Sequence, residues 1–122
     1  MDSTTLLLRQ VHPSWVQVGR VTSQVFRPTP KDESKLSVYD GGLIDPASAF
    51  VHFVHELRLK SAGVLGVYVS ECEELGLKVL ADPEPFPEHA LIDFTGLDRN
   101  RTDNIAKSLR SKSTTRGWLH QA

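Results

Sequence analysis

The chain has 122 residues, with 14 Lys and Arg against 15 Asp and Glu, which gives a formal net charge of −1. Hydrophobic residues make up 39% and charged residues 24%, the balance of a soluble globular protein. These values exclude a disordered chain, a collagen-like chain and a strongly basic nucleic-acid arm. We expect residues 1–122 to form a single globular domain.

Residues 6–11 form a short apolar run closed by a His-Pro pair, and residues 21–26 alternate between two faces. Both patterns predict strands. Residues 27–34 hold two prolines and mixed charge, typical of an exposed loop. Residues 35–39 predict a third strand, stopped by Asp-Gly-Gly.

The first helix is predicted from Asp45, a suitable N-cap, with Pro46 at the first helical position. An apolar stripe follows at helical spacing, made of Ala49, Phe50, Phe53, Val54 and Leu57. Arg58 and Lys60 lie near its end, where cations complement the helix dipole.

Residues 64–69 are rich in β-branched side chains, as in a central strand covered on both faces. A short helical turn is predicted at 71–75, capped by Ser70 and ended by Gly76. Strands at 77–81 and 90–94 flank a stiff loop at 82–88 with three prolines.

The second main helix is predicted at 102–116, with Ile105, Ala106 and Leu109 inward and Gly117 as its stop. Trp118 and Leu119 are expected to pack back on the body. This element order predicts an α+β fold with a single mixed, partly antiparallel sheet and two main helices. The connection from 35–39 to 64–69 is a candidate for a right-handed parallel crossover.

Cys72 is the only cysteine, which excludes an intrachain disulfide and a cysteine-rich zinc site. We expect it to be a small buried side chain rather than a reactive thiol. The longest apolar run, 62–69, is far shorter than the ~20 residues of a membrane span, and the N-terminus lacks the basic region of a secretory signal. A cytoplasmic protein without membrane contact is therefore expected.

Polar residues cluster around the first three predicted strands. Guanidinium groups match phosphate or carboxylate oxygens, so two arginines and a histidine near small hydroxyl groups can hold an anionic ligand. The alternative is that the arginines lie on the surface and the serines bond to neighbouring backbone. The candidates are Arg9, His12, Arg20, Ser23, Ser37 and Tyr39.

The loop at 82–89 supplies Glu88 and His89, which a proline-stiffened segment can hold as a general acid or base. The alternative is a rigid connection with Phe86 in the core. His52, His55 and Glu56 can share a metal in principle, but their order is not that of a zinc protease, so a solvated helix face is favoured and no metal is expected.

Charge is distributed unevenly along the chain. Residues 99–116 hold six basic residues against Asp103, and residues 71–88 hold six acidic residues against Lys78. A basic helix can contact nucleic acid, yet no aromatic residues interleave with it, so nucleic acid is not favoured as a partner. The two segments can also meet across a self-association interface, or the helix face can simply be solvated.

No glycine-rich phosphate loop, dinucleotide fingerprint or Gly-x-Ser-x-Gly elbow occurs, so these enzyme mechanisms rank low and no cofactor is expected. Short motifs do resemble those of a loose set of small uncharacterised bacterial proteins with no established activity. They are Arg9-Gln10-Val11-His12-Pro13, Gly19-Arg20-Val21-Thr22-Ser23 with Phe26, Leu36-Ser37-Val38, Asp82-Pro83 and Pro87-Glu88-His89-Ala90. The resemblance implies that His12, Arg20, Ser23, Ser37 and His89 belong to one site.

Three functional hypotheses follow. The first is a non-enzymatic bacterial module that binds a partner protein or ligand, for example in a defence or toxin–antitoxin operon. The second is a small nucleotide- or phosphate-ligand enzyme with a residue order like that of ADP-ribosyltransferases, which requires Arg9, His12, Arg20, Ser37 and Glu88 to line one cleft. The third is weak nucleic-acid binding through the helix at 99–116.

Overall fold

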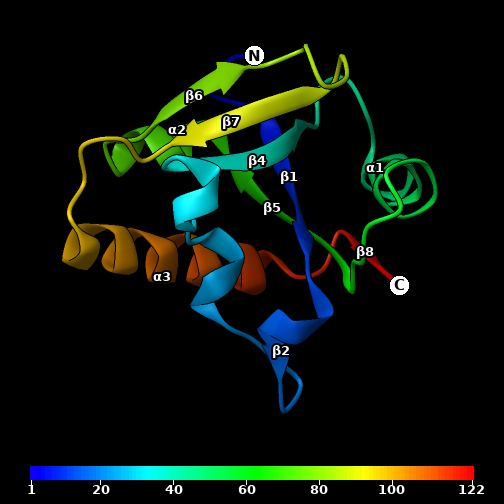
Figure 1. The fold of residues 1–122 in the computed structure, drawn as a ribbon, viewed down its shortest axis with the longest axis horizontal. Coiled ribbons are helices and arrows are strands. Elements are labelled where there is room, and N and C mark those ends of the chain that lie inside the picture. Colours follow the sequence, from blue (N-terminus) through cyan, green and yellow to red (C-terminus); the bar gives the residue numbers. More distant parts are fainter.

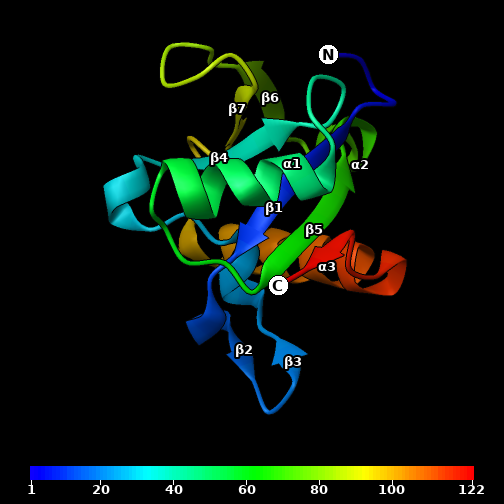
Figure 2. The same cartoon turned by 90° about the vertical axis from the view of Figure 1, so that its right-hand side faces the viewer.

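One antiparallel sheet organises the protein, with helices on both of its faces. A computed structural model describes all residues 1–122. The six-stranded sheet has the order β6-β7-β4-β1-β5-β8, and a separate hairpin pairs β2 with β3. Helix α1 covers one face of the sheet, and α2 and α3 cover the other (Figures 1 and 2). The predicted α+β class with one main sheet is confirmed.

The bounds of the elements agree closely with most of the predicted segments. The strands of the main sheet are β1 (Leu6–Val11), β4 (Lys35–Asp40), β5 (Gly63–Tyr68), β6 (Lys78–Ala81), β7 (His89–Asp93) and β8 (His120–Gln121). The hairpin strands are β2 (Val16–Gln17) and β3 (Arg20–Val21). The helices are α1 (Pro46–Val51), α2 (Val69–Glu74) and α3 (Arg99–Arg116).

Every pair of neighbouring strands is antiparallel, so the sheet is more regular than the mixed sheet expected. Both β4 and β5 pair with β1, one on each side. They therefore run parallel to each other but are not adjacent. The crossover that contains α1 joins these two strands across β1.

Two apolar layers form because successive side chains of a strand point to opposite faces. Leu7 and Val11 of β1 face the larger layer, with α2, α3 and the helical turns after the hairpin. Leu8, between them, faces the smaller layer under α1, together with Tyr39 and Ala49. Strand β5 is buried along nearly its whole length, as predicted for a central strand.

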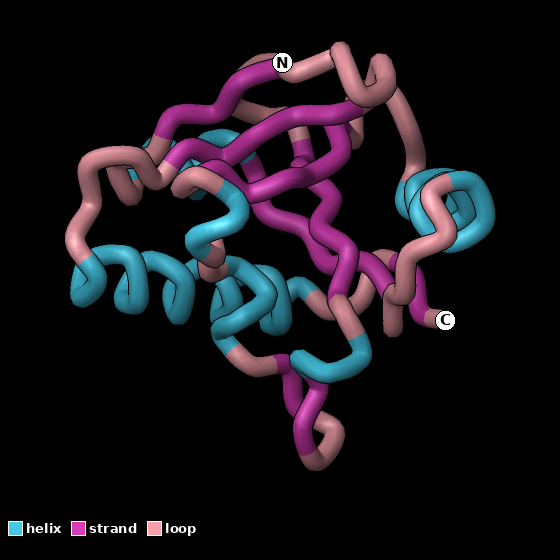
Figure 3. The backbone as a smooth tube through the Cα atoms, viewed as in Figure 1, coloured by secondary structure: helices cyan, strands magenta, loops and turns pink.

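The strand predicted at 21–26 is wrong. Only Arg20–Val21 is a strand, and Ser23–Phe26 forms a 3-10 helix, η2. Figure 3 shows short helical turns and a small hairpin between β1 and β4. Val25 and Phe26 are adjacent and both fully buried in the same apolar layer. A strand would point them to opposite faces, whereas a helical turn places both in the core.

The first helix begins as predicted but does not continue as a regular α-helix. The Asp45 carboxylate accepts a hydrogen bond from Ser48 N–H at 2.8 Å, and Pro46 follows at the first position. After Val51 the chain widens into a π-helix, η4 (His52–Glu56). The wider turn breaks the spacing of the apolar stripe. Only Ala49 of the stripe is fully buried, and Leu57 is 38% exposed.

Two helix starts differ from prediction. Helix α2 begins after Tyr68 rather than Ser70, because the Glu71 carboxylate accepts the Tyr68 N–H at 2.8 Å. Helix α3 begins at Arg99 rather than 102, with Asp98 as its N-cap. The inward side chains predicted for α3 are confirmed: Ile105, Ala106 and Leu109 are buried.

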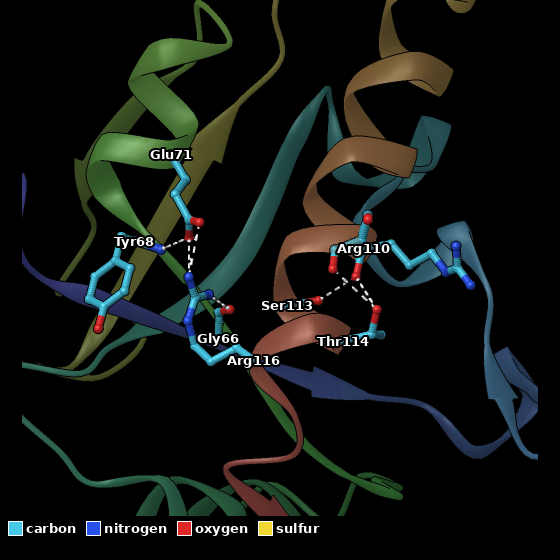
Figure 4. A network of polar contacts seen from close by, with 8 residues as sticks. Gly66, Tyr68, Glu71, Arg110, Ser113, Thr114 and Arg116 are labelled. Atoms are coloured by element: carbon cyan, nitrogen blue, oxygen red, sulfur yellow. Dashed lines mark hydrogen bonds and ion pairs between the residues drawn. The ribbon is translucent and has the colours of Figure 1, made fainter.

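An ion-pair network joins α3 to α2 across β5 (Figure 4). Both oxygens of Glu71 lie 2.9–3.0 Å from Arg116 Nη2, and Arg116 Nη1 donates to the Gly66 carbonyl at 2.6 Å. The guanidinium also lies over the Tyr68 ring, 4.7 Å from its centroid. One residue of the basic segment thus pairs with one of the acidic segment inside a single chain.

The last residues pack back on the body, as expected. Trp118 and Leu119 are half-buried against the two apolar layers, and β8 pairs with Gly63 and Val64. Gly63 makes this possible, because a Cβ there would clash with the His120 carbonyl oxygen and lie 2.9 Å from the Trp118 ring. Cys72 is fully buried, as predicted, and burial raises the pKa of its thiol to about 12.

The β2–β3 turn places a β-branched residue in the left-handed region. Val18 has φ 51° and Gly19 has φ 72°, the signs required at both central positions of a type I′ turn. The Val18 side chain is fully exposed, so no burial offsets this strain.

We expect Val18→Asn to raise the free energy of unfolding by about 1 kcal/mol, because asparagine tolerates this conformation and suits a type I′ turn. Urea unfolding of the two proteins measures the difference. A variant no more stable than the parent would show that the turn carries no such strain.

Candidate functional site

The sheet opens between its two central strands. Strand β1 pairs with β4 only at Leu7↔Asp40 and Leu8↔Tyr39, whereas it pairs with β5 along all six of its residues. The next pairs in register, Arg9 with Val38 and Gln10 with Ser37, do not form. In Figure 1 the two strands diverge from their point of contact near the start of β1 and the end of β4.

A cavity of about 180 Å³ lies at this opening. Its walls are mainly apolar and come from β4, the segment after α1, and the proline-rich loop. Polar groups of β1, β4 and β7 line the rest. The lining residues are Arg9, Gln10, Ser37, Val38, Tyr39, Phe53, Leu57, Leu59, Phe86 and His89.

Arg9 spans the gap where the strands separate. Its Nε donates to the Val25 carbonyl at 2.8 Å and its Nη1 to the Ser37 carbonyl at 2.8 Å. The guanidinium also lies over the Trp15 ring, 5.2 Å from its centroid. Arg9 therefore supplies the Ser37 carbonyl with a donor in place of the missing strand pairing.

Arg9 has no carboxylate partner: the arginines in ion pairs are Arg27, with Asp103, and Arg116, with Glu71. Burial lowers the pKa of Arg9 to about 10, and the charge of Asp32 opposes only part of this effect. The group stays cationic at neutral pH. Its Nη2 makes no hydrogen bond and is not sealed from solvent, so it can serve an anion.

Gln10 contributes a buried donor without a partner. Its side chain is only 5% exposed, and its Oε1 accepts from the Ser61 hydroxyl at 2.8 Å. Its Nε2 is sealed and has no hydrogen-bond partner. A buried amide left unpaired costs about 1–3 kcal/mol, which pairing with an acceptor would recover.

Aromatic rings form one side of the cavity around Phe86. The Phe86 ring lies 5.1 Å from Tyr39, 4.6 Å from His52 and 5.1 Å from His89, measured between centroids. Phe86 is half-buried in this cluster. The proline-rich loop thus serves as a rigid connection that places an aromatic wall.

Tyr39 is held as a neutral phenol. Burial and the charge of Glu88 raise its pKa well above the ordinary value. Its hydroxyl lies 2.8 Å from His52 Nδ1. Because the phenol stays protonated, Tyr39 is suited to hydrogen bonding and apolar contact rather than to nucleophilic attack.

His89 is 9% exposed, and its ring is oriented by Asp82. Nδ1 lies 3.1 Å from the Asp82 carbonyl and 3.2 Å from its carboxylate. Its Nε2 makes no hydrogen bond within the protein. This nitrogen is a further polar group that a bound molecule can use.

The structure brings together four of the eight predicted site residues, Arg9, Ser37, Tyr39 and His89. Glu88 is adjacent: it is half-buried, and its charge acts on Tyr39 without its side chain lining the cavity.

The other three predicted site residues lie elsewhere. His12 caps a helical turn through Ser14, and its Nδ1 accepts the Ser14 N–H at 3.0 Å. Arg20 and Ser23 line a separate hollow beside α3. The single cleft of Arg9, His12, Arg20, Ser37 and Glu88 that the ADP-ribosyltransferase-like order requires does not form. Of the joint site implied by the resemblance, only Ser37 and His89 meet.

The helix face with His52, His55 and Glu56 is solvated only in part. His52 turns toward Tyr39 and Phe86, while His55 and Glu56 are exposed. No group of three or more histidine, cysteine or acidic side chains lies close enough to share a metal ion.

Gln10, whose buried amide has no hydrogen-bond partner, was not among the site residues predicted from the sequence. Its signal was a long polar amide inside the apolar run at 6–11, next to Val11, which proved to be buried. Leu57 and Leu59 were also missed as cavity residues, because their place after a π-helix does not follow from periodicity.

No protein-family model, curated protein or solved structure matches the chain. None of its helices combines the length and apolarity needed to cross a bilayer.

Proposed function

We propose that the protein is a non-enzymatic binding module for a small, mainly apolar molecule that carries a carboxylate. The observation that carries this proposal is the Gln10 amide: Gln10 lines the cavity, and its Nε2 is a buried donor without a partner, which a ligand would engage by turning the side chain into the cavity. Buried polar groups are nearly always paired, so this one is a candidate for pairing with a ligand.

The cavity size limits the ligand. An apolar cavity of about 150 Å³ holds benzene, so the cavity of about 180 Å³ has room for one ring or a branched chain of similar size. Phe53, Phe86 and Leu57 provide apolar contact for that body. Leu59 is 49% exposed, which extends the apolar surface to the mouth.

The polar groups favour an anionic head. Gln10 Nε2 and Arg9 Nη2 are donors without partners, and no carboxylate lines the cavity. A cationic head would lie near an uncompensated guanidinium, whereas a carboxylate would be attracted to it. The preferred ligand class is therefore a small aromatic or branched carboxylic acid.

Benzoate is the probe that tests this assignment, with benzylamine as a cation of similar size. We expect benzoate to bind and Gln10→Leu to weaken its binding about 10-fold or more, because a hydrogen bond to a charged group contributes about 1.5–3 kcal/mol. Gln24→Leu makes the same substitution at an exposed position and should leave binding unchanged. Ligand-observed NMR and isothermal titration measure both.

Gln10→Leu should fold normally, because it removes an unpaired donor and Ser61 keeps the Gly63 carbonyl as an acceptor at 2.9 Å. Its thermal unfolding serves as the check. Equal binding of benzylamine and benzoate, or undiminished benzoate binding by the folded Gln10→Leu variant, would refute the proposed function.

A further inference from the structure

A second polar surface lies where the hairpin meets α3, and it shares no residue with the cavity. The β2–β3 hairpin projects from the body in both ribbon views (Figures 1 and 2). At its base is an open hollow of about 620 Å³. The hollow is lined by Gln17, Val18, Arg20, Val21, Thr22, Ser23, Lys107 and Arg110.

This hollow holds three cationic side chains and no acidic one. Lys107 and Arg110 are three positions apart on α3, so they lie on neighbouring sites of one helix face. Arg20 joins them from the hairpin. The single acid of the basic helix, Asp103, is already paired with Arg27 at 3.1 Å. Positive charge is therefore uncompensated at this surface.

The base of the hairpin is fixed to the helix by a side-chain hydrogen bond. Arg110 Nε donates to the Val21 carbonyl at 2.8 Å, which locks the hairpin against α3. Thr22 precedes η2 but makes no capping bond, and its Oγ1 is buried without a partner. Because this hydroxyl is shielded from solvent, the three cations rather than Thr22 are the groups available to phosphate oxygens.

The shape of the surface favours a duplex over other phosphate ligands. A projecting two-stranded ribbon has the width that the major groove of B-DNA admits. Single-strand binding relies on aromatic side chains that stack on bases, and none lines the hollow. The major groove of duplex RNA is too deep and narrow for side chains to read.

The side chain at the tip of the hairpin also favours duplex DNA as the ligand. Val18 is 101% exposed and strained at φ 51°, so its side chain stabilises nothing within the chain. An apolar side chain at this point can contact thymine methyl groups in the groove. Residues held in a strained backbone conformation cluster at functional sites, and nothing else in the fold explains the strain at Val18.

We propose that the β2–β3 hairpin and the adjoining face of α3 bind double-stranded DNA. Arg20, Lys107 and Arg110 contact the phosphodiester backbone, and Val18 enters the major groove. With only three phosphate contacts the affinity is modest and strongly dependent on salt.

Fluorescence anisotropy of a labelled random-sequence duplex, titrated at several salt concentrations, tests this proposal. Three phosphate contacts give a slope of log K against log salt of about −3. In the double variant Arg20→Gln/Lys107→Gln the slope should fall to about −1, since each lost contact removes about one unit. The matched control Arg99→Gln/Arg101→Gln removes the same charge from exposed positions outside the hollow and should keep the original slope.

Other nucleic acids, inorganic phosphate and a variant of Val18 at the tip of the hairpin distinguish duplex DNA from other phosphate ligands. Duplex DNA should bind more tightly than the single strand or duplex RNA, and inorganic phosphate should compete only weakly. Val18→Asn should bind the duplex less tightly with an unchanged slope. Three results would overturn the proposal. They are the absence of duplex binding at low salt, tighter binding of the single strand or of RNA, and an equal loss of duplex affinity in both double variants. Undiminished binding by Val18→Asn would remove Val18 from the groove contact.

Discussion

Replacing Arg116 by methionine should lower the free energy of unfolding by about 3 kcal/mol, because it leaves a mostly buried carboxylate without its partner. The Arg116 and Glu71 side chains are 24% and 16% exposed. The variant also removes the donor to the Gly66 carbonyl and the contact with the Tyr68 ring. Urea unfolding at neutral pH measures the loss.

The matched control is Arg101→Met, which makes the same substitution at an exposed position of α3 and should change stability by less than about 0.5 kcal/mol. A double-mutant cycle with Glu71→Gln isolates the ion pair. Additive effects in this cycle would mean that Arg116 acts only through Gly66 and Tyr68.

Acidification provides an independent check on the same pair. Burial acts to raise the pKa of Glu71, but hydrogen bonds from Arg116 and from the Tyr68 N–H outweigh it and hold the pKa below the ordinary 4.5. Because the folded-state pKa is depressed, the stabilisation is present above the unfolded value and is lost as pH falls through the folded value. The stability difference between the parent and Arg116→Met should therefore shrink below pH 4.5. A difference independent of pH would argue against a role for the Glu71 charge.

Arg9→Met should also destabilise the fold, by about 2–4 kcal/mol. The substitution keeps the apolar stem but leaves the carbonyl of buried Val25 without its donor, which costs about 1–3 kcal/mol, and removes the bond to the exposed Ser37 carbonyl, which contributes about 1 kcal/mol more. Chemical denaturation measures the change. Arg9→Lys should lie between the parent and Arg9→Met, because a single ammonium cannot reproduce the fork that spans two diverging carbonyls.

The benzoate test separates structural from binding roles of Arg9. If its charge attracts the carboxylate, the folded Arg9→Lys protein should still bind benzoate more tightly than benzylamine. Full stability in Arg9→Met would show that the opening between β1 and β4 does not depend on this side chain.

Local sequence patterns predicted the elements whose causes are themselves local. Asp45 and Pro46 specify the start of α1, since a cap acts on backbone groups within one turn. The apolar run at 6–11, closed by His-Pro, and the β-branched run at 64–69 predict β1 and β5, because strand propensity follows from neighbouring residues. The inward stripe of Ile105, Ala106 and Leu109 has the same origin.

The features that define the candidate site depend on contacts between distant segments. Arg9 bonds to Ser37, 28 positions away, and Arg110 to Val21, 89 positions away. No periodicity reports where β1 and β4 separate, or that Gln10 lacks a partner for its amide. The helical turn at Ser23–Phe26 follows from the need to bury Val25 and Phe26 in the same layer, although alternation favoured a strand.

Composition and short-range patterning were sufficient for the α+β class, for most strands and for the caps, because these depend on steric and hydrogen-bonding preferences within a few residues. Tertiary packing alone selected the cavity and the basic hollow. Each of these sites is defined by donors or charges that have no partner within the protein. Whether a group has a partner depends on residues far away in the sequence, so it is decided only by the folded structure.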